Sequence, residues 1–273
     1  MNSHTCPLCS TPAPWLAQQR LLDRHDVDYF QCPVCDLLFT EQPHWLGEAY
    51  AEAISRLDTG AIARNQFSAR LTLIIAFIAR LERNANALDF GAGHGVFVRM
   101  MRDLGFDFRW YDKHAANLYA LGFEGDPRAS HELVTAFEVL EHLADVRGDL
   151  ELLFGSAPAY VLVGTLLHDG HRPGWWYYLL DSGQHVVFYS RRTMAHIADR
   201  YGYEALVGAE HTLFVRRDRS APLRNALLRR VVERASTAVL ASSLLPRGVV
   251  ERLAGFASRV QTDYRSFVSG REE

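Results

Sequence analysis

The sequence lacks any apolar run that approaches the roughly 18 residues needed for a membrane-spanning helix. Its first residues, Met-Asn-Ser-His-Thr, also lack the basic-then-apolar profile of a secretory signal peptide. Both absences favour a protein of the cytoplasm. Disorder is excluded for most of the chain, because 48% of its 273 residues are hydrophobic and only 22% are charged.

Lysine is nearly absent, since Lys113 is the single lysine among 29 basic residues. The net charge of −3 is unevenly distributed: residues 216–273 hold twelve arginines against six acidic residues, so the preceding part of the chain is acidic. An acidic body repels the phosphates of a nucleic acid. We therefore expect no nucleic-acid partner for the body, whereas the basic C-terminal part is a separate question.

Cysteine is scarce, and all four cysteines lie in the pairs Cys6-Pro-Leu-Cys9 and Cys32-Pro-Val-Cys35. Each pair predicts a tight turn that directs two sulfurs at one point, and two such turns supply the four thiolates of a tetrahedral Zn²⁺ site. Four protein ligands leave no open position, so the predicted zinc is structural. Two disulfides or a redox pair are the alternatives, which a reducing cytoplasm and the lack of a surrounding βαβ unit disfavour. Residues 1–45 are thus predicted to form a zinc ribbon.

The residues after the ribbon alternate between strand and helix patterns. Strands are expected at residues 87–90, 108–112, 133–137 and 160–164, and near 205–207 and 212–215, with helices over 61–82, after residue 95 and at 191–201. This alternation predicts an α/β fold with a doubly wound, mainly parallel sheet. We expect this domain to span residues 46–217.

Residues 218–273 form a third predicted segment, a basic helical C-terminal extension. Two helices are expected within 222–268, and the first places Leu228 and Val232 on an apolar face with arginines opposite. The favoured interpretation is an appendage that docks on the body or on a second subunit. The alternative is a membrane-surface helix at the inner face of the membrane, because basic amphipathic helices bind anionic lipid.

A glycine-rich turn follows the first strand of the central domain, in the stretch from Asp89 to Gly95, Asp-Phe-Gly-Ala-Gly-His-Gly. Glycines let a ligand approach the backbone, and the following helix offers free N–H groups. The spacing is G-x-G-x-G, not the G-x-G-x-x-G of dinucleotide binders. We expect the Asp89 carboxylate at the mouth of the loop, where it would disfavour a pyrophosphate. It would favour a ligand with an ammonium and a sulfonium group, which is the charge pattern of S-adenosyl-L-methionine.

Asp112 ends the second strand, where an acidic side chain can accept hydrogen bonds from both ribose hydroxyls of a nucleoside. NAD-binding folds share this feature, so it does not discriminate between cofactors. The alternative is a turn residue that caps the next helix.

Residues 87–95 resemble the first motif of class I S-adenosylmethionine-dependent methyltransferases, and residues 136–143, Ala-Phe-Glu-Val-Leu-Glu-His-Leu, resemble their fourth-strand motif as found in the ubiquinone-biosynthesis-like group. The resemblance covers roughly residues 50–215. It implies a seven-stranded Rossmann-like sheet and a cofactor site. The residues that the resemblance assigns to the cofactor are Asp89, Gly91, Gly93, Gly95, Asp112, Phe137 and Glu138, of which the last two flank the methyl group.

With its ribbon, the chain is similar to a bacterial group that includes methyltransferases of nucleotide-linked deoxysugars. A late Glu-His pair is assigned to catalysis in that group, and Gln184-His185 occupies the comparable stretch here, with glutamine in place of glutamate. The resemblance therefore implies a small-molecule acceptor, a sugar or sugar nucleotide. His185 is the first candidate for the base, since the unperturbed pKa of histidine is near the working pH. Its alternatives are a role in binding the acceptor and a purely structural role. His142 is the second catalytic candidate, and its alternative role is to order the loop after the fourth strand.

Other interpretations stay open at this stage. An RNA methyltransferase is one, since some of those carry a zinc ribbon, although the acidic ribbon and the absence of an Asn-Pro-Pro-Tyr motif argue against it. A non-catalytic binding module with the same fold is another. The aromatic run 175–178, Trp-Trp-Tyr-Tyr, is either a lid over the site or a cover for the sheet edge.

Overall fold

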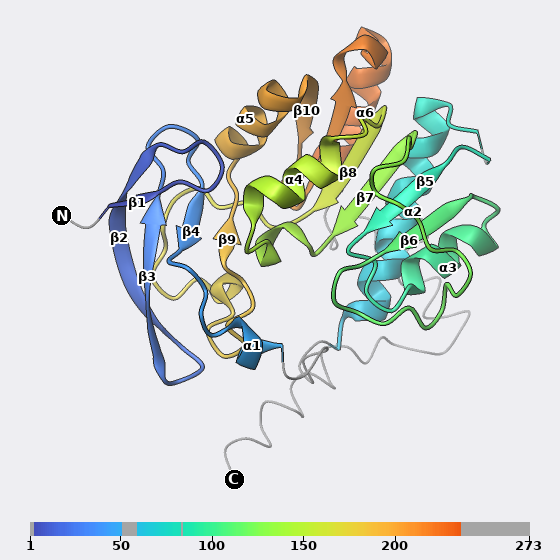
Figure 1. Cartoon of the computed structure of the whole chain (residues 1–273). Coiled ribbons are helices and arrows are strands. Elements are labelled where there is room, and N and C mark those ends of the chain that lie inside the picture. Colours follow the sequence, from blue (N-terminus) through green and yellow to red (C-terminus); the bar gives the residue numbers. More distant parts are fainter. Residues whose placement is uncertain (1–2, 51–58, 83, 236–273) are drawn as a thin grey trace, which may run out of the picture.

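The computed structural model of the chain describes residues 3–50, 59–82 and 84–235. Two sheets organise these residues, a small one formed mainly by the N-terminal segment and a larger one formed by the central domain (Figure 1). The small sheet has the order β1-β2-β3-β4-β9, and the large sheet has the order β10-β11-β8-β7-β5-β6.

The large sheet has the α/β character that the alternating pattern predicts. Its parallel strands are β5 (Ala87–Phe90), β6 (Phe108–Tyr111), β7 (Leu133–Phe137) and β8 (Tyr160–Gly164). The hairpin of β10 (Tyr203–Val207) and β11 (His211–Arg216) adds two strands, of which β11 is antiparallel to β8. The parallel strands are short and mostly apolar, as expected of strands that are covered on both faces, and Asp89 in β5 and Arg109 in β6 are their charged residues.

Six strands form this sheet in the described residues, one fewer than the predicted seven. Beyond β6 the chain makes only an isolated parallel bridge between Trp110 and Glu124. Gly122, Gly125 and Pro127 interrupt the segment that would form the missing strand. Glycine weakens a strand and proline cannot donate to its ladder, so the pairing ends after one bridge.

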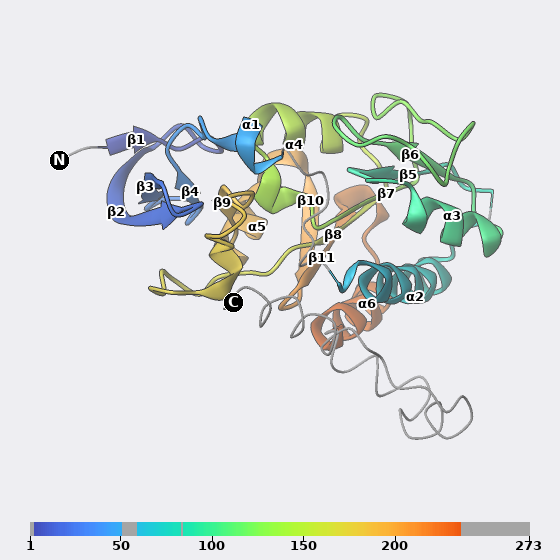
Figure 2. The same cartoon turned by 90° about the horizontal axis from the view of Figure 1, so that it is seen from below.

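Helices cover both faces of the large sheet (Figure 2). One face holds α2 (Ala61–Ala79), α3 (Val96–Asp103) and α6 (Pro222–Arg234), and the other holds α4 (Val146–Phe154). α5 (Arg191–Tyr201) begins at a capping box in which the Ser190 hydroxyl accepts a hydrogen bond from Thr193 N at 3.2 Å. The short helices are α1 (Leu46–Ala49) and the 3₁₀ turns η1 (Leu140–His142), η2 (Trp176–Tyr178) and η3 (Arg217–Arg219).

α6 docks on the body of the protein, as expected of the first helix of the C-terminal extension. It packs against α2 and the β10–β11 hairpin, and Leu228 and Val232 are buried there. The second predicted helix lies outside the described residues. Within the part of the chain that the structure describes, no helix combines the length and the apolar character that crossing a membrane requires.

The small sheet crosses the predicted boundary between ribbon and central domain. Its N-terminal strands are β1 (Ser3–Thr5), β2 (Pro12–Leu21), β3 (His25–Gln31) and β4 (Leu38–Thr40), and its fifth strand is β9 (Val187–Phe188). β9 lies beside β4 in Figure 1, although it comes from the far end of the central domain. One apolar core also runs from the ribbon strands to α4, α5 and β9. The ribbon is therefore continuous with the central domain.

Candidate functional site

The glycine loop after β5 has the backbone conformation that its glycines permit. Gly91, Gly93 and Gly95 have φ angles of +74°, +53° and +87°, in the left-handed region that side chains disfavour. A Cβ atom on Gly91 would lie 2.5 Å from Val139 Cγ2, whereas a Cβ atom on Gly93 would meet nothing within 4 Å. The backbone at Gly93 therefore faces open space, and a ligand can approach it directly.

Asp112, at the end of β6, holds this loop. Its Oδ2 accepts a hydrogen bond from Gly93 N at 2.8 Å, and its Oδ1 accepts from His114 N at 2.7 Å and Ala115 N at 2.8 Å. Asp112 thus has the turn role that the sequence left open, and it also connects the turn to the glycine loop. A carboxylate has about four acceptor positions, so these three bonds leave one for a ligand hydroxyl.

The position of Asp89 corrects the sequence-based expectation. The carboxyl lies beneath the loop and not at its mouth: it is 4% exposed, and Thr135 Oγ1 donates a hydrogen bond to its Oδ1 at 2.7 Å. The physical reason is that Asp89 is still part of β5, a strand buried on both faces, and the loop begins only at Gly91. Burial, together with a smaller effect of the neighbouring charge of Asp112, raises the pKa of this carboxyl to about 7, against the lowering effect of the Thr135 hydrogen bond.

Phe137 and Glu138 follow each other at the end of β7 but face different environments. The Phe137 ring lies edge-on to that of Phe97, with centroids 5.2 Å apart, and packs on the core. Glu138 is exposed and has a φ of +55°, which is unusual for a residue with a side chain. Its Oε2 lies 3.7 Å from Nε of Arg64 on α2. Only Glu138 therefore presents a polar group to the open edge of the sheet.

The two predicted catalytic histidines come together with a third residue, Glu141. Glu141 and His142 belong to η1, and His185 precedes β9. One potential ligand atom from each of the three lies within 4.8 Å of the others, and the two imidazole centroids are 4.8 Å apart. Glu141 is 0% exposed and His185 is 4% exposed. We call these three residues the His–Glu cluster.

Hydrogen bonds orient each member of the His–Glu cluster. His142 Nδ1 lies 3.1 Å from the Gln184 carbonyl oxygen, and His185 Nδ1 lies 2.7 Å from the Tyr177 carbonyl oxygen. Since a carbonyl only accepts, each Nδ1 carries the proton and each Nε2 keeps a lone pair. The Tyr177 hydroxyl donates to Glu141 Oε1 at 2.8 Å, while Oε2 has no partner among the described residues. This pattern of outer partners is the one found behind metal-binding histidines.

Burial sets the protonation state of His185. It lowers the pKa of His185 to about 4, against an opposing effect of the Glu141 charge, so His185 is neutral at pH 7. The Tyr50 hydroxyl lies 3.0 Å from His142 Nδ1 and covers the cluster from the end of α1. Burial and the charges of Glu141 and Asp112 raise the pKa of Tyr50 to about 12, so this hydroxyl keeps its proton.

The aromatic run is divided between the surface and the core of the protein. Trp176 is 69% exposed, whereas Tyr177 and Tyr178 are buried. The Tyr177 hydroxyl is a central contact of the cluster, because it also lies 3.2 Å from both Thr165 Oγ1 and Leu166 N. The sequence identified the two histidines but missed the structural role of Tyr177. The Glu141-His142 dipeptide is the sequence signal beside which the other members of the cluster lie.

The four cysteines gather as predicted. Cys6 Sγ lies 3.5 Å from Cys35 Sγ, Cys9 Sγ lies 3.4 Å from Cys32 Sγ, and all four sulfurs lie within 4.8 Å of one another. These separations exceed the roughly 2.05 Å of a disulfide and approach those of sulfurs about 2.3 Å from a shared zinc ion. The hydrogen bond from Cys35 lowers the pKa of the Cys6 thiol to about 5 and raises that of Cys35. The residues fit a closed tetrahedral zinc site.

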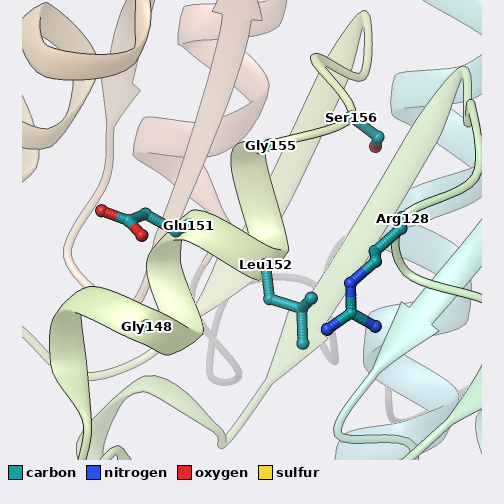
Figure 3. A pocket seen from close by; sticks show the side chains of 6 residues that line it. All are labelled: Arg128, Gly148, Glu151, Leu152, Gly155 and Ser156. Atoms are coloured by element: carbon teal, nitrogen blue, oxygen red, sulfur yellow. The ribbon is translucent and has the colours of Figure 1, made fainter.

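Two hollows border the central domain. One, of about 620 Å³, lies where the ribbon meets the start of α5, and its lining includes Trp175, Trp176, Arg172, Arg191 and Arg192. The other, of about 410 Å³, lies beside α4 (Figure 3). There Arg128 and Leu152 point toward each other while Glu151 points away. None of the predicted site residues lines either hollow.

The sequence matches known proteins through its central domain. The match to the family described as a methyltransferase domain covers residues 62–207. A search of curated proteins finds no matching sequence.

Several solved structures are similar to the chain. Human N-acetylserotonin methyltransferase in complex with SAM is 15% identical, over 64% of this chain and 60% of that chain, with a TM-score of 0.45. Magnesium protoporphyrin IX methyltransferase from Synechocystis PCC 6803 with bound SAH is 12% identical, over 63% of this chain and 92% of that chain, with a TM-score of 0.43. An O-methyltransferase family protein from Burkholderia thailandensis is 15% identical, over 64% of both chains, with a TM-score of 0.42.

Proposed function

This chain belongs to the family of methyltransferase domains, since the family match spans more than half of its residues, and from this premise we propose that it transfers a methyl group from S-adenosyl-L-methionine to a small molecule. The observation that carries the proposal is the open backbone at Gly93, held in place by Asp112. It lies at the carboxyl edge of the parallel strands, where α/β sheets bind ligands.

The cofactor would lie along the glycine loop, with Gly91, Gly93 and Gly95 against its methionine part and Asp112 toward its ribose hydroxyls. The space in front of Gly93 and the remaining acceptor position of Asp112 fit such a ligand. When bound, the cofactor supplies a methyl group on a sulfonium, which is a good leaving group. The protein then has to align the acceptor and remove its proton.

We propose that the His–Glu cluster receives that proton. His185 is neutral at pH 7 and has a lone pair on Nε2, while its Nδ1 is fixed by the Tyr177 carbonyl. His142 has the same arrangement through the Gln184 carbonyl and is less buried, so it is the second acceptor for the proton. The low pKa of His185 makes it a weak base, and this favours sharing the proton between the two histidines.

A second way to activate the acceptor is favoured by one observation. Glu141 Oε2 is buried without a partner in the described residues, and the Nε2 lone pairs of His142 and His185 accompany it. One carboxylate and two imidazoles form a ligand set for a divalent metal ion. A metal ion held there would polarise the acceptor hydroxyl and lower its pKa. In this case the histidines would be ligands and not bases.

For the acceptor we propose a sugar or sugar nucleotide. The hollow of about 620 Å³ supports this assignment, because Trp175 and Trp176 offer flat faces for a sugar, and Arg172, Arg191 and Arg192 offer charges for its phosphates. We expect a nucleoside diphosphate to bind the chain with a dissociation constant that rises when Arg192 is replaced by Ala. An unchanged dissociation constant would exclude a nucleotide as part of the acceptor.

Isothermal titration with S-adenosyl-L-methionine tests the cofactor assignment. We expect measurable binding by the wild-type chain and at least about 100-fold weaker binding by Asp112→Ala, because this variant loses both the loop contact and the ribose acceptor. Asp103→Ala, which removes an exposed carboxylate on α3, is the matched control and should bind normally. The absence of binding by the wild-type chain would remove the enzyme proposal and leave a non-catalytic module.

Metal titration separates the two activation modes. His185→Ala should bind the cofactor normally and turn over about 10²–10⁴-fold more slowly if the histidine is the base. If the cluster holds a metal, adding Mg²⁺, Mn²⁺ or Zn²⁺ to protein with an intact ribbon should raise turnover. Glu141→Gln should abolish that response. Turnover that no added metal changes would exclude the metal mode, and near-normal turnover of His185→Ala would exclude both.

A further inference from the structure

The strand that follows His185 is paired with the ribbon. β9 is antiparallel to β4, with Leu38 opposite Phe188 and Phe39 opposite Val187. Thr40 N adds a hydrogen bond to the Val186 carbonyl oxygen at 3.0 Å. Because β9 has only two residues, it cannot be stable as a strand by itself, and β4 supplies its backbone partners.

β4 is in turn held by the second cysteine turn. Cys32 N donates to the Leu37 carbonyl oxygen at 2.8 Å, so the turn leads directly into β4. The carbonyl oxygen of Cys35 accepts a hydrogen bond from Thr193 Oγ1 on α5 at 2.9 Å, and that of Asp36 lies 3.1 Å from His168 Nε2. The cysteine turn therefore contacts the central domain both at a residue that precedes β9 in the sequence and at a residue that follows it.

The segment before β9 reaches both the His–Glu cluster and the ribbon end. Val186 N donates to the Glu141 carbonyl oxygen at 2.9 Å, directly after His185. Gln184 Nε2 donates to the Ala49 carbonyl oxygen at 2.8 Å. Trp45 Nε1 donates to the Gly183 carbonyl oxygen at 2.8 Å. Residues 183–188 are thus held between the ribbon and η1.

We propose that the ribbon is a positioning element of the active site: zinc bound by the four cysteines orders β4, and β4 places the 183–188 segment with His185 against Glu141 and His142. The free energy of zinc binding is folding energy for the residues around it. Loss of zinc would therefore release β9 and separate His185 from the other two residues. None of the hydrogen bonds in this chain of contacts involves the glycine loop or β5, so cofactor binding should survive, although Leu88 and Phe90 of β5 belong to the same apolar core as the ribbon strands.

The positional part of this inference does not depend on the chemistry of the cluster, and only its activity readout rests on the proposed function. A sharp test uses Thr40→Pro in the full chain. Proline removes the N–H group that binds the Val186 carbonyl oxygen, and Thr40 is the last residue of β4. Thr40→Val is the matched control, because it removes the side-chain hydroxyl and keeps the N–H group.

Hydrogen exchange and histidine NMR spectra are the readouts. We expect amide exchange in peptides that cover 183–188 to rise about tenfold or more in Thr40→Pro, with unchanged exchange in residues 87–111. The imidazole resonances of His185 should shift, turnover should fall, and the dissociation constant of S-adenosyl-L-methionine should stay within about twofold of the wild-type value. Thr40→Val should resemble the wild type in all four measurements.

Zinc removal provides the second measurement and does not depend on that variant folding. Treatment of the wild-type chain with EDTA, or the Cys9→Ser substitution, should raise exchange in 183–188 together with the ribbon peptides. Exchange that rises only within residues 1–40, or rises equally in residues 87–111, would overturn the proposal. A wild-type chain that binds no cofactor would instead overturn the proposed function, and the exchange results would still decide the positional inference.

Discussion

The proposed cofactor side and the proposed acceptor side of the site are built in different ways. The proposed cofactor side comes from consecutive residues, the loop from Gly91 to Gly95, which the end of β6 holds through Trp110, Tyr111 and Asp112. The proposed acceptor side is the His–Glu cluster, whose two histidines are 43 positions apart in the chain and whose contacts include Tyr50 from the end of α1. The difference teaches that a ligand loop can be encoded locally, whereas the reacting groups depend on the assembly of the whole fold.

Each side contains one buried carboxyl, and the two differ in their hydrogen bonds. Asp89 Oδ1 accepts from Thr135 Oγ1, and its raised pKa keeps a large neutral fraction at pH 7. Glu141 Oε1 accepts from Tyr177, and its Oε2 has no partner among the described residues. A buried polar atom without a partner is costly, which is why the free oxygen of Glu141 points to a ligand.

The largest expected effect is a pH dependence of the free energy of unfolding that arises from Asp89. Burial raises the pKa of Asp89 from 3.8 to about 7, so the folded state binds more protons than the unfolded state between these values. The free energy of unfolding should therefore fall as the pH rises from about 4 to 8, by on the order of 2–4 kcal/mol from this group. Asp89→Asn should remove this slope and be more stable than the wild type at pH 8, as measured by urea unfolding.

The exposed Asp103 gives the control for this measurement. Asp103→Asn changes a surface carboxyl on α3 and should leave the slope unchanged. Equal slopes for the wild type and Asp89→Asn would mean that Asp89 is ionised in the folded state throughout this range.

The second prediction concerns the tyrosine that holds the acceptor side. Tyr177→Phe removes the hydroxyl that contacts Glu141, Thr165 and Leu166. We expect turnover to fall by about 10–100-fold and the free energy of unfolding to fall by about 1–3 kcal/mol, with cofactor affinity unchanged. Kinetics, thermal unfolding and cofactor titration would measure the three quantities.

Tyr29→Phe is the matched control, because the buried Tyr29 hydroxyl has no partner among the described residues. Its removal should not reduce stability or turnover. A loss of cofactor affinity in Tyr177→Phe would contradict the separation between the two sides of the site.

The smallest expected effect lies in the loop. Gly93→Ala places a methyl group in the space that the cofactor would occupy, and we expect its affinity for S-adenosyl-L-methionine to fall about tenfold or more. Gly122→Ala is the control, since Gly122 also has a positive φ, +82°, with nothing within 4 Å of an added Cβ. Both variants should lose similar stability, about 1 kcal/mol, but only Gly93→Ala should lose affinity. Equal affinities in the two variants would place the cofactor elsewhere.

Local sequence signals predicted the elements of the central domain closely. The strands at 87–90, 133–137 and 160–164 and the helix at 191–201 occur with the predicted bounds. The three strands are short and mostly apolar, and the helix lies between the Ser190 cap and Gly202, so that local residues determine each element. The seventh strand was predicted from resemblance alone, and the glycines and proline of its segment prevented it.

The sequence by itself determined the class of fold, the glycine loop and the four-sulfur cluster, because each depends on residue types at fixed short spacings. Only the tertiary structure decided that Asp89 lies beneath the loop, that Tyr177 and Glu141 complete the histidine pair, and that β9 pairs with the ribbon. These features depend on which distant segments meet and on how deeply they bury a charge. No local pattern of residues encodes that information, since it arises from packing the whole chain around one core.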